Sequence, residues 1–228
     1  MDALHNAAQM GGRHSLLVVI LNFNGIADTL ECLASLRAQT LHDVDILVVD
    51  NASQHSQAAQ IAAAFPEVEV IALPVNEGWA GGNNVGLRLA LERGHGHVCL
   101  LNNDTLLDND ALEALLAASD RLEGRAMVMP AVRFYDRPDT WQLRPAPASP
   151  GPSQDLVALN FAFGVCLLLP AGLLREIGLL DERFFLQLEE TDYHLRAAAA
   201  GYGSFCALHA RITHKLSLIH ISEPTRPY

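Results

Sequence analysis

The sequence predicts an α/β fold, with a mostly parallel central sheet and helices on both of its faces. Apolar runs of strand length alternate with stretches of helical periodicity through the first half of the chain, and the links between them are short. The runs are rich in branched side chains, as expected of strands that are buried on both faces. Each run also stops at a cluster of polar residues, which would place those side chains along one edge of the sheet.

Turn signals separate the expected elements of the first half. Asn22–Gly25 ends the first strand, while Pro66 and Pro74 are expected to end the second helix and the third strand. The glycine-rich segment Asn76–Asn84 is expected to open the third helix. The expected strands are Leu16–Leu21, Val44–Val49, Val68–Leu73 and His97–Leu101, and the expected helices are Ile26–Ala38, Gln57–Phe65 and one whose apolar face runs from Val85 to Leu91.

The second half has a different character, because a long segment rich in proline and polar residues interrupts it. That segment, Tyr135–Gln154, is expected to be a surface loop without regular structure. It contains Trp141, which either anchors the loop or serves in a lid or in a contact with an acceptor substrate. The other expected elements are a helix capped by Asp108–Asp110 and running to about Ala118, strands Met127–Phe134 and Phe161–Leu169, a helix from Pro170 to Ile177, and a helix from Glu189 to Ala200 that ends at Gly201.

Composition limits the classes of function open to this chain. A length of 228 residues, half of them hydrophobic, is sufficient for one domain with a sizeable core. The formal net charge of −11 argues against a nucleic-acid partner, which would require a basic face. An acidic protein that binds an anionic ligand needs a compensating cation, and a divalent metal ion is the most direct one.

The sequence also indicates where the protein is expected to reside. No apolar run approaches the ~18 residues of a membrane span. Met1–Arg13 lacks the basic start and the apolar centre of a signal peptide, so the cytoplasm is the expected location. The cysteines form no CxxC pair and are expected to be buried thiols of a reducing compartment. They are Cys32, Cys99, Cys166 and Cys206.

The polar clusters at the strand ends form the candidate site. They contain Asn24, Asp50, Asn76 and Asp104, one from each of four strand ends that would meet on one edge of the sheet. A hard carboxylate such as Asp104 at this edge suits Mg²⁺ or Mn²⁺, and such a metal suits phosphates. The sequence therefore predicts a nucleotide-diphosphate held on a metal at Asp104.

Two carboxylates in the second half are open to two interpretations. Glu189 and Glu190 stand at the expected start of a helix, where the macrodipole favours negative charge. From the residues alone, they are either groups that stabilise the helix or catalytic groups.

Five segments resemble, in their order, the motifs of the family 2 inverting glycosyltransferases, particularly the rhamnosyltransferase-like bacterial branch. The resemblance covers about residues 15–215 and is weakest in the proline-rich loop. The segments are Val18–Gly25, Val49–Ser53, Asn76–Gly86 with its Gly-Trp-Ala-Gly-Gly-Asn-Asn-Val-Gly, Leu101–Thr105 and Cys166–Tyr202.

This resemblance implies the GT-A fold in one domain, residues 1–215, with a nucleotide-sugar-binding half at 15–105 and an acceptor half at 106–215. It implies that a sugar is transferred, with inversion and with Mg²⁺ or Mn²⁺, from a nucleotide-diphospho-sugar to a hydroxyl of a glycan or lipid-linked acceptor. dTDP-rhamnose or a UDP-hexose is the expected donor, and cell-surface polysaccharide synthesis is the expected setting. Glu190 takes the position of the catalytic base, and Asp104 and His214 take those of the metal-binding residues.

The resemblance also assigns the groups around these residues. Asp50 matches the carboxylate that bonds the pyrimidine base, and Asn102 stands in place of the first carboxylate of the family's Asp-x-Asp motif. Glu189, Asp192 and Trp141 are expected to contact the acceptor or to support such contacts. The residues expected to bind the donor are Asn22, Asn24, Asp50, Asn51, Asn76, Gly78, Trp79, Gly82, Asn83, Asn102 and Asn103.

The segment 216–228 fits no element of this pattern, and Leu216–Arg226 resembles a translated sequencing adapter. It is therefore expected to be a non-native tail that leaves the acceptor half truncated. A missing C-terminus would be one place for peripheral association with the inner face of a membrane.

Other classes of protein remain as alternatives. A catalytically weak or inactive nucleotide-sugar-binding domain would share the donor motifs. A sugar-nucleotide pyrophosphorylase would be expected to carry a glycine-rich, basic loop after its first strand, and Asn22–Gly25 has no basic residue. A dinucleotide-binding domain would need GxGxxG after a strand, which is missing, as are the P-loop and GxSxG patterns.

Overall fold

The fold is built on a mixed sheet of ten strands in a computed structural model that describes residues 16–146 and 155–216. The strands are β1 (Leu16–Asn22), β2 (Val44–Asp50), β3 (Glu69–Ala72), β4 (His97–Asn102), β5 (Thr105–Leu107), β6 (Ala126–Phe134), β7 (Trp141–Leu143), β8 (Leu156–Ala158), β9 (Cys166–Pro170) and β10 (Gly203–His214). The helices are α1 (Ile26–Arg37), α2 (Gln57–Ala64), α3 (Gly78–Arg93), α4 (Ala111–Arg121), α5 (Ala171–Ile177) and α6 (Glu189–Ala199).

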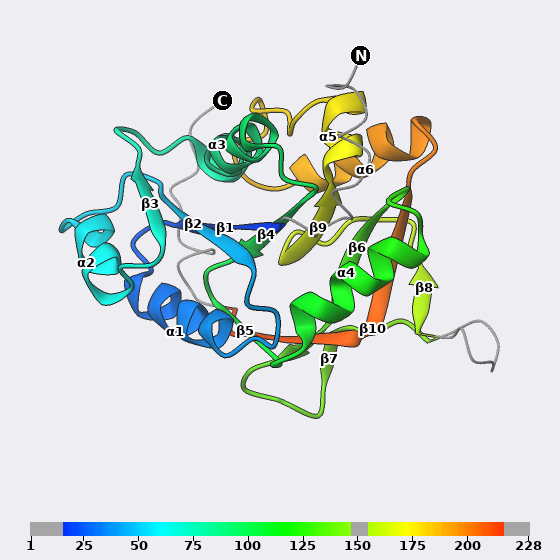
Figure 1. The fold of residues 1–228 in the computed structure, drawn as a ribbon, viewed down its shortest axis with the longest axis horizontal. Helices are drawn as coiled ribbons and strands as arrows, with labels where there is room; N and C mark the ends of the chain where they lie inside the picture. The colour runs from blue at the N-terminus through cyan, green and yellow to red at the C-terminus, as the bar shows by residue number, and fades with distance from the viewer. Residues whose placement is uncertain (1–15, 147–154, 217–228) are drawn as a thin grey trace, which may run out of the picture.

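The strands follow the order β3-β2-β1-β4-β9-β6-β10-β5, while β7 pairs with β6 and β8 pairs with β10. Figure 1 shows α3, α5 and α6 on one side of the sheet and α1, α2 and α4 on the other. The expected α/β architecture, with helices on both faces, is therefore confirmed. The segment Met1–Arg13 and the expected non-native tail, apart from Leu216, lie outside the described part of the chain.

The first half forms the parallel part of the sheet, because β2 and β4 both pair in parallel with β1 and β3 pairs in parallel with β2. All four expected strands are present with bounds close to those predicted. The register places Asn22 beside Asp50 and Leu21 beside Asn102. The carboxyl ends of β1, β2 and β4 therefore meet on one rim, as the polar clusters predicted.

The second half of the sheet is largely antiparallel, which limits the expected parallel arrangement to the first half. β9 lies antiparallel to β4 and β6, and β5 lies antiparallel to β10, whereas β10 runs parallel to β6. An apolar run such as Cys166–Pro170 shows that a strand is buried on both faces, but it carries no information about the strand's direction. The direction follows from where the chain enters the sheet.

Two expectations for the second half need correction. The segment after Tyr135 is not wholly irregular, since Trp141–Leu143 forms β7, which pairs with Val132 and Arg133 at the end of β6. A three-residue strand inside a proline-rich segment leaves too short a pattern to detect. The strand expected from Phe161 begins only at Cys166. The preceding residues form a turn that brings Val165 to the end of β4, where the Val165 carbonyl accepts the Asn102 N–H at 2.9 Å.

The helix after β5 also begins differently from the prediction. Asp110 is its N-cap residue but makes no side-chain capping bond. Asp108 is ion-paired with Arg133 of β6 instead. A carboxylate that precedes a helix can accept hydrogen bonds either from the helix N–H groups or from a nearby cation. Here the ion pair with Arg133 takes the place of a capping bond by Asp108.

Close packing sets the position of α3 over the sheet. A Cβ atom on Gly86 would lie 2.5 Å from Val19 Cγ2, and one on Gly82 would collide with Leu21. The helix can therefore approach β1 only because these positions carry no side chain. This close approach brings the start of α3 to the rim where β1, β2 and β4 end.

The core agrees with the expected chemistry of the cysteines. All four are buried and free, and Cys99 Sγ lies 3.6 Å from Cys166 Sγ across β4 and β9. Burial raises the pKa of the Cys32 and Cys206 thiols to about 12, so these groups stay protonated. Within residues 16–146 and 155–216, no helix combines the length and the apolar character needed to cross a membrane.

Candidate active site

A buried hydrogen-bond network around Asn22 joins the ends of β1 and β2. The amide nitrogen of Asn22 lies 2.8 Å from Asp50 Oδ1 and 3.0 Å from Ser53 Oγ. Its amide oxygen accepts a bond from the Thr29 hydroxyl at 2.8 Å. Because Asn22 is fully buried and both ends of its amide are used, we expect it to hold Asp50 in place rather than to contact a donor. This revises the role predicted for Asn22.

Asn51 connects the end of β2 to the start of α3. Its amide nitrogen donates to Asn76 Oδ1 at 2.8 Å and to the Gly78 carbonyl at 3.1 Å, and its amide oxygen accepts the Glu77 N–H. Asn76 Oδ1 also accepts the Gly78 N–H at 2.9 Å. These bonds hold Gly78 at a φ of +72°, in the left-handed region that favours glycine.

Asn24 occupies the neighbouring turn after β1. It has a φ of +54°, which asparagine tolerates better than most residues. Its N–H donates to Ser53 Oγ and its side-chain oxygen accepts the Gln54 N–H, both at 2.8 Å. The loops that follow β1 and β2 are therefore bonded to each other at the rim, where both were expected to bind a nucleoside.

The two halves of the chain meet at the start of α3. The Trp79 N–H donates to the Phe185 carbonyl at 2.7 Å. Deeper in the helix, the buried Asn84 donates to the Leu180 carbonyl and to Glu182 Oε1, both at 2.9 Å. Sequence reasoning identified neither Phe185 nor Asn84, although a buried asparagine on the apolar side of a helix is a signal that such a bond exists.

Trp79 connects the end of β4 to the start of α6. Its indole N–H lies 3.3 Å from Asn102 Oδ1. On the other side, a Cβ atom on Gly164 would be 3.5 Å from Trp79 Cζ2 and 3.8 Å from Glu190 Cδ. The indole ring and the Glu190 carboxyl group therefore flank the same glycine. This arrangement places Glu190, from the second half of the chain, beside the rim formed by the first half.

Asp104 and His214 form a buried pair beneath the same rim. His214 Nε2 lies 3.2 Å from Asp104 Oδ1, and the side chains are 6% and 0% exposed. His214 Nδ1 lies 2.9 Å from Gln142 Oε1. Since this oxygen can only accept, Nδ1 carries a proton, and Nε2 faces the carboxylate. Gln142 was not identified from the sequence, because it lies in the segment expected to be irregular.

This pair fits a divalent cation. His214 Nε2 has no hydrogen-bond partner among the described residues, although it is buried. Two lone pairs facing each other across 3.2 Å repel, so either a proton on Nε2 or a metal cation is needed between these two atoms. The described residues offer no group of three or more His, Cys, Asp or Glu side chains for a metal. A metal at Asp104 and His214 would therefore need further oxygens from a phosphate ligand and water, the arrangement that Mg²⁺ commonly adopts.

The start of α6 is a strained turn that leads into a buried carboxylate. Gln187 and Leu188 both have a φ of +73°, a conformation that costs energy for side chains of this size and is frequent at functional sites. Glu189 follows at 4% exposure. Burial, together with the neighbouring Glu190 carboxyl, raises the pKa of Glu189 to about 7. Hydrogen bonds from the backbone N–H groups of Glu189 and Gln187 lower this pKa but do not cancel the increase. Glu189 is therefore largely protonated below neutral pH.

This raised pKa predicts a pH-dependent effect of Glu189→Gln on stability. Because the folded state binds the Glu189 proton more tightly than the unfolded state, the wild-type protein loses stability as pH rises from about 4.5 to about 7. Glutamine removes that loss, so the variant should gain about 1–3 kcal/mol over wild type between pH 4.5 and pH 8. Urea unfolding at both pH values measures this difference. Glu92→Gln, at an exposed position of α3, is the control and should change stability equally at both.

Several residues predicted for the site are held in structural bonds. Asn103 is buried and donates to the Gly25 carbonyl and to Thr29 Oγ1. Asn83 is buried inside α3, where its amide donates to the Trp79 carbonyl at 2.9 Å. We therefore expect both to shape the rim rather than to bind the donor. Gly82 likewise acts through its close approach to β1.

Two residues predicted for acceptor binding have local partners. Asp192 is ion-paired with Arg196 on the next turn of α6 at 2.8 Å. Trp141 lies in β7, half-buried, with the Arg133 and Arg144 guanidinium groups 5.7 and 5.0 Å from its ring centre. Of its two interpretations, the structural anchor is the one with observed contacts. Trp141 also precedes Gln142, so β7 acts on the site by orienting His214.

Comparison with known proteins agrees with this geometry. The model of the family described as glycosyl transferase family 2 matches residues 17–178. The chain belongs to glycosyl transferase family 2. The match includes the rim, Trp79, Asp104 and Gly164, and ends before α6 and His214.

Curated relatives of this family 2 chain include a hexosyltransferase. The chain is 26% identical over 195 residues to the low-salt glycan biosynthesis hexosyltransferase Agl10 of Haloferax volcanii, covering 80% of this chain and 61% of the relative. It is 29% identical over 174 residues to the uncharacterized protein Rv1525 of Mycobacterium tuberculosis, covering 75% of this chain and 63% of that protein. The chain therefore spans somewhat less than two thirds of the length of these relatives.

A solved structure confirms the fold of this family 2 chain. The crystal structure of Staphylococcus aureus TarS superposes with a TM-score of 0.67 over 91% of this chain and 38% of the other, at 18% identity. At that identity, the similarity concerns the fold alone, and it confirms the expected GT-A architecture.

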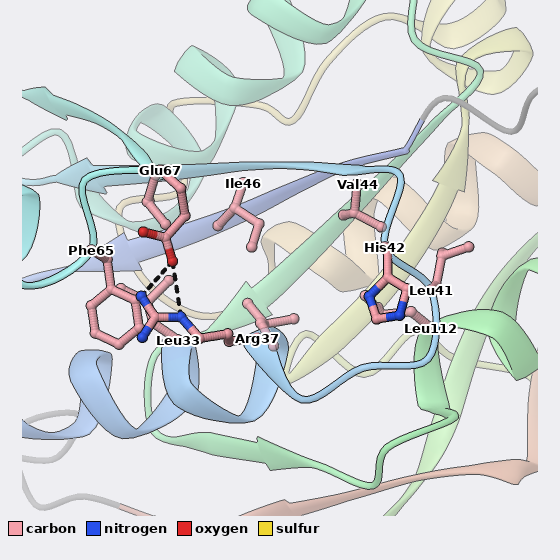
Figure 2. A pocket seen from close by; sticks show the side chains of 11 residues that line it. Leu33, Arg37, Leu41, His42, Val44, Ile46, Phe65, Glu67 and Leu112 are labelled. Atoms are coloured by element: carbon pink, nitrogen blue, oxygen red, sulfur yellow. Dashed lines mark hydrogen bonds and ion pairs between the residues drawn. The ribbon is translucent and has the colours of Figure 1, made fainter.

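A separate hollow lies away from the rim of the family 2 domain. Figure 2 shows it between α1, the start of β2 and the segment before β3, with a volume of about 160 Å³. Arg37 closes one side, since its Nε lies 3.0 Å from Glu67 Oε1 and its guanidinium group lies 4.3 Å from the centre of the Phe65 ring. The hollow is lined mainly by apolar side chains and contains none of the predicted site residues.

Proposed function

We propose that this chain transfers a sugar, with inversion, from a nucleotide-diphospho-sugar to a hydroxyl of a glycan or lipid-linked acceptor. The observation that carries the proposal is the convergence of two chemistries on one rim. Asp104 and His214 form a pair suited to a metal. The end of β4, which leads to Asp104, is bonded to Trp79, and the indole ring and the Glu190 carboxyl group both lie against Gly164. A single displacement needs a leaving-group site and a base held in fixed geometry.

The donor side of the proposal rests on the loops after β1, β2 and β3. Asp50 is held by Asn22 and is proposed to accept a hydrogen bond from the pyrimidine base. Asn24, Asn51 and Asn76 shape the loops around it. Asp104 and His214 would hold Mg²⁺ or Mn²⁺, which would neutralise the diphosphate and stabilise it as the leaving group. Such a cation would also supply the positive charge that an acidic chain requires to bind an anionic ligand.

Glu190 is proposed as the general base. It accepts the proton of the acceptor hydroxyl, whose oxygen attacks the anomeric carbon from the face opposite the diphosphate, so the sugar inverts. The carboxyl group is half-buried, and its Oε2 has no hydrogen-bond partner within residues 16–146 and 155–216. That buried oxygen is consistent with a group held ready for a substrate. Its buried neighbour Glu189 is proposed to support the position of Glu190.

The identities of donor and acceptor are also proposals. dTDP-rhamnose follows from the rhamnosyltransferase-like motifs, and a UDP-hexose is supported by the hexosyltransferase name of Agl10. The word glycan in that name supports a glycan or lipid-linked acceptor. Synthesis of a cell-surface polysaccharide at the cytoplasmic face of a membrane, with peripheral association, would suit such an acceptor.

A ligand screen tests the proposal. The purified chain is heated with UDP- and dTDP-sugars, with and without Mn²⁺, and unfolding is followed. A ligand at about 100 times its Kd should add about 2.7 kcal/mol to stability, which is several degrees in Tm for a chain of this size. The stabilising donor is then incubated with hydroxyl acceptors and the released nucleotide is measured. Binding without turnover would support a nucleotide-sugar-binding domain instead, and the absence of any stabilising donor would contradict the proposal.

A further inference from the structure

Asn102 stands where the family motif has a carboxylate, and its orientation is set by Trp79. The indole Nε1–H lies 3.3 Å from Asn102 Oδ1. An indole N–H can only donate a hydrogen bond, so the amide oxygen, and not the amide nitrogen, must face it. The two N–H groups of the Asn102 amide are therefore directed away from Trp79.

This orientation bears on metal binding. The oxygen is the atom of an asparagine amide that binds hard cations, and here it accepts the Trp79 hydrogen bond. The amide nitrogen of Asn102 has no hydrogen-bond partner among the residues that the structure describes. Asn102 is only half-buried at the end of β4, so this nitrogen remains available to a ligand.

We propose that Asn102 donates a hydrogen bond to an anionic oxygen of the bound nucleotide's diphosphate. Trp79 is the positioning residue that turns the amide for this contact. The inference rests on the proposed function, because it assigns a group to the donor site. It also gives these residues different roles. Asp104 and His214 would hold the cation, while Asn102 supplies a neutral hydrogen-bond donor that adds no negative charge beside the diphosphate.

Replacement of Asn102 by aspartate or alanine tests whether the side chain at this position donates a hydrogen bond to an anionic ligand. In Asn102→Asp, one carboxylate oxygen still accepts the Trp79 N–H, while the other opposes an anionic ligand. Without metal, in EDTA, UDP and dTDP should bind this variant at least about tenfold more weakly than wild type. Asn102→Ala, which only removes the donor, should lose less affinity than Asn102→Asp. Uridine and thymidine, which carry no phosphate, should bind all three proteins alike.

Trp79→Phe tests the positioning role. Phenylalanine keeps a ring beside Gly164 but removes the N–H that orients the amide. In this background, the side chain at 102 can turn, so the extra loss caused by aspartate relative to alanine should shrink. Isothermal titration with the nucleotides measures each affinity, and thermal unfolding identifies variants that are not folded. Asn102→Ala serves if Asn102→Asp does not fold, because it should weaken UDP binding but not uridine binding.

The outcomes separate this inference from the proposed function. Equal affinity of the aspartate and alanine variants for UDP and dTDP would overturn the inference and leave the function standing. Equal losses for nucleosides and nucleoside diphosphates would do the same, because the contact would then not be to the phosphates. A wild-type protein that binds neither nucleoside diphosphate, with or without Mn²⁺, would overturn both.

Discussion

Glu190→Gln is expected to slow sugar transfer by about 10²- to 10⁴-fold, the usual contribution of a general base. Glutamine has nearly the same shape but cannot accept the proton of the acceptor hydroxyl. Donor affinity should change little, because Glu190 belongs to the second half of the chain, whereas the loops proposed to bind the donor belong to the first half. The measurement is the rate of transfer under saturating donor, together with the donor Kd.

The control for Glu190→Gln is Thr191→Val. Thr191 is an exposed neighbour on α6, and this substitution, like Glu190→Gln, nearly preserves the shape of the side chain. It should leave both the transfer rate and the donor Kd near wild type. A Glu190→Gln variant that transfers sugar at a rate within a few-fold of wild type would remove Glu190 from the role of base. A parallel loss of donor affinity would instead indicate a role for Glu190 in the donor site.

Asp104→Ala is expected to abolish the part of donor binding that depends on metal. Asp104 and His214 are the two side chains suited to the ion, and His214 alone offers one nitrogen. Loss of a group that merely supports a metal ligand costs about 10- to 100-fold in metal affinity, so loss of a ligand should cost at least as much. Titration of the nucleotide diphosphate with Mn²⁺ and in EDTA separates the two contributions to affinity.

Gln142→Leu extends this test to the group behind the metal site. It removes the acceptor that fixes the proton on His214 Nδ1, so the expected loss of Mn²⁺-dependent affinity is smaller than for Asp104→Ala. Asp110→Ala, at an exposed carboxylate before α4, is the control for the loss of negative charge. If Asp104→Ala keeps the wild-type difference between Mn²⁺ and EDTA, the metal is not held at Asp104.

Much of the fold could be predicted because the relevant signals are local. The strands β1, β2 and β4 are continuous apolar runs, and each ends in polar residues that a buried strand cannot accommodate. The helices α1 and α3 begin at turn signals and carry apolar residues at helical spacing. By contrast, β7 has only three residues, and its strand conformation depends on pairing with the end of β6. Its sequence therefore shows no recognisable strand pattern.

The candidate site divides in the same way. That the ends of β1, β2 and β4 would share one rim follows from the parallel strands, and the register, which pairs Asn22 with Asp50 and Leu21 with Asn102, confirms it. Which of the predicted residues face a ligand does not follow from the sequence. Asn22 and Asn103 are of the same type as Asn102, but the structure uses their amides in buried bonds. Hydrogen-bond partners far along the chain decide between these roles, and their distance in sequence hides them.

The sequence by itself determined the α/β class, the family resemblance and the edge of the sheet where the polar side chains gather, because each of these depends on residues close together in the chain. Only the tertiary structure decided that β9 is antiparallel, that Gln142 orients His214, and that Trp79 bonds Asn102 and lies beside the same glycine as Glu190. These contacts join segments separated by long stretches of chain. Their geometry depends on the packing of the whole domain, and packing is not encoded in any one segment.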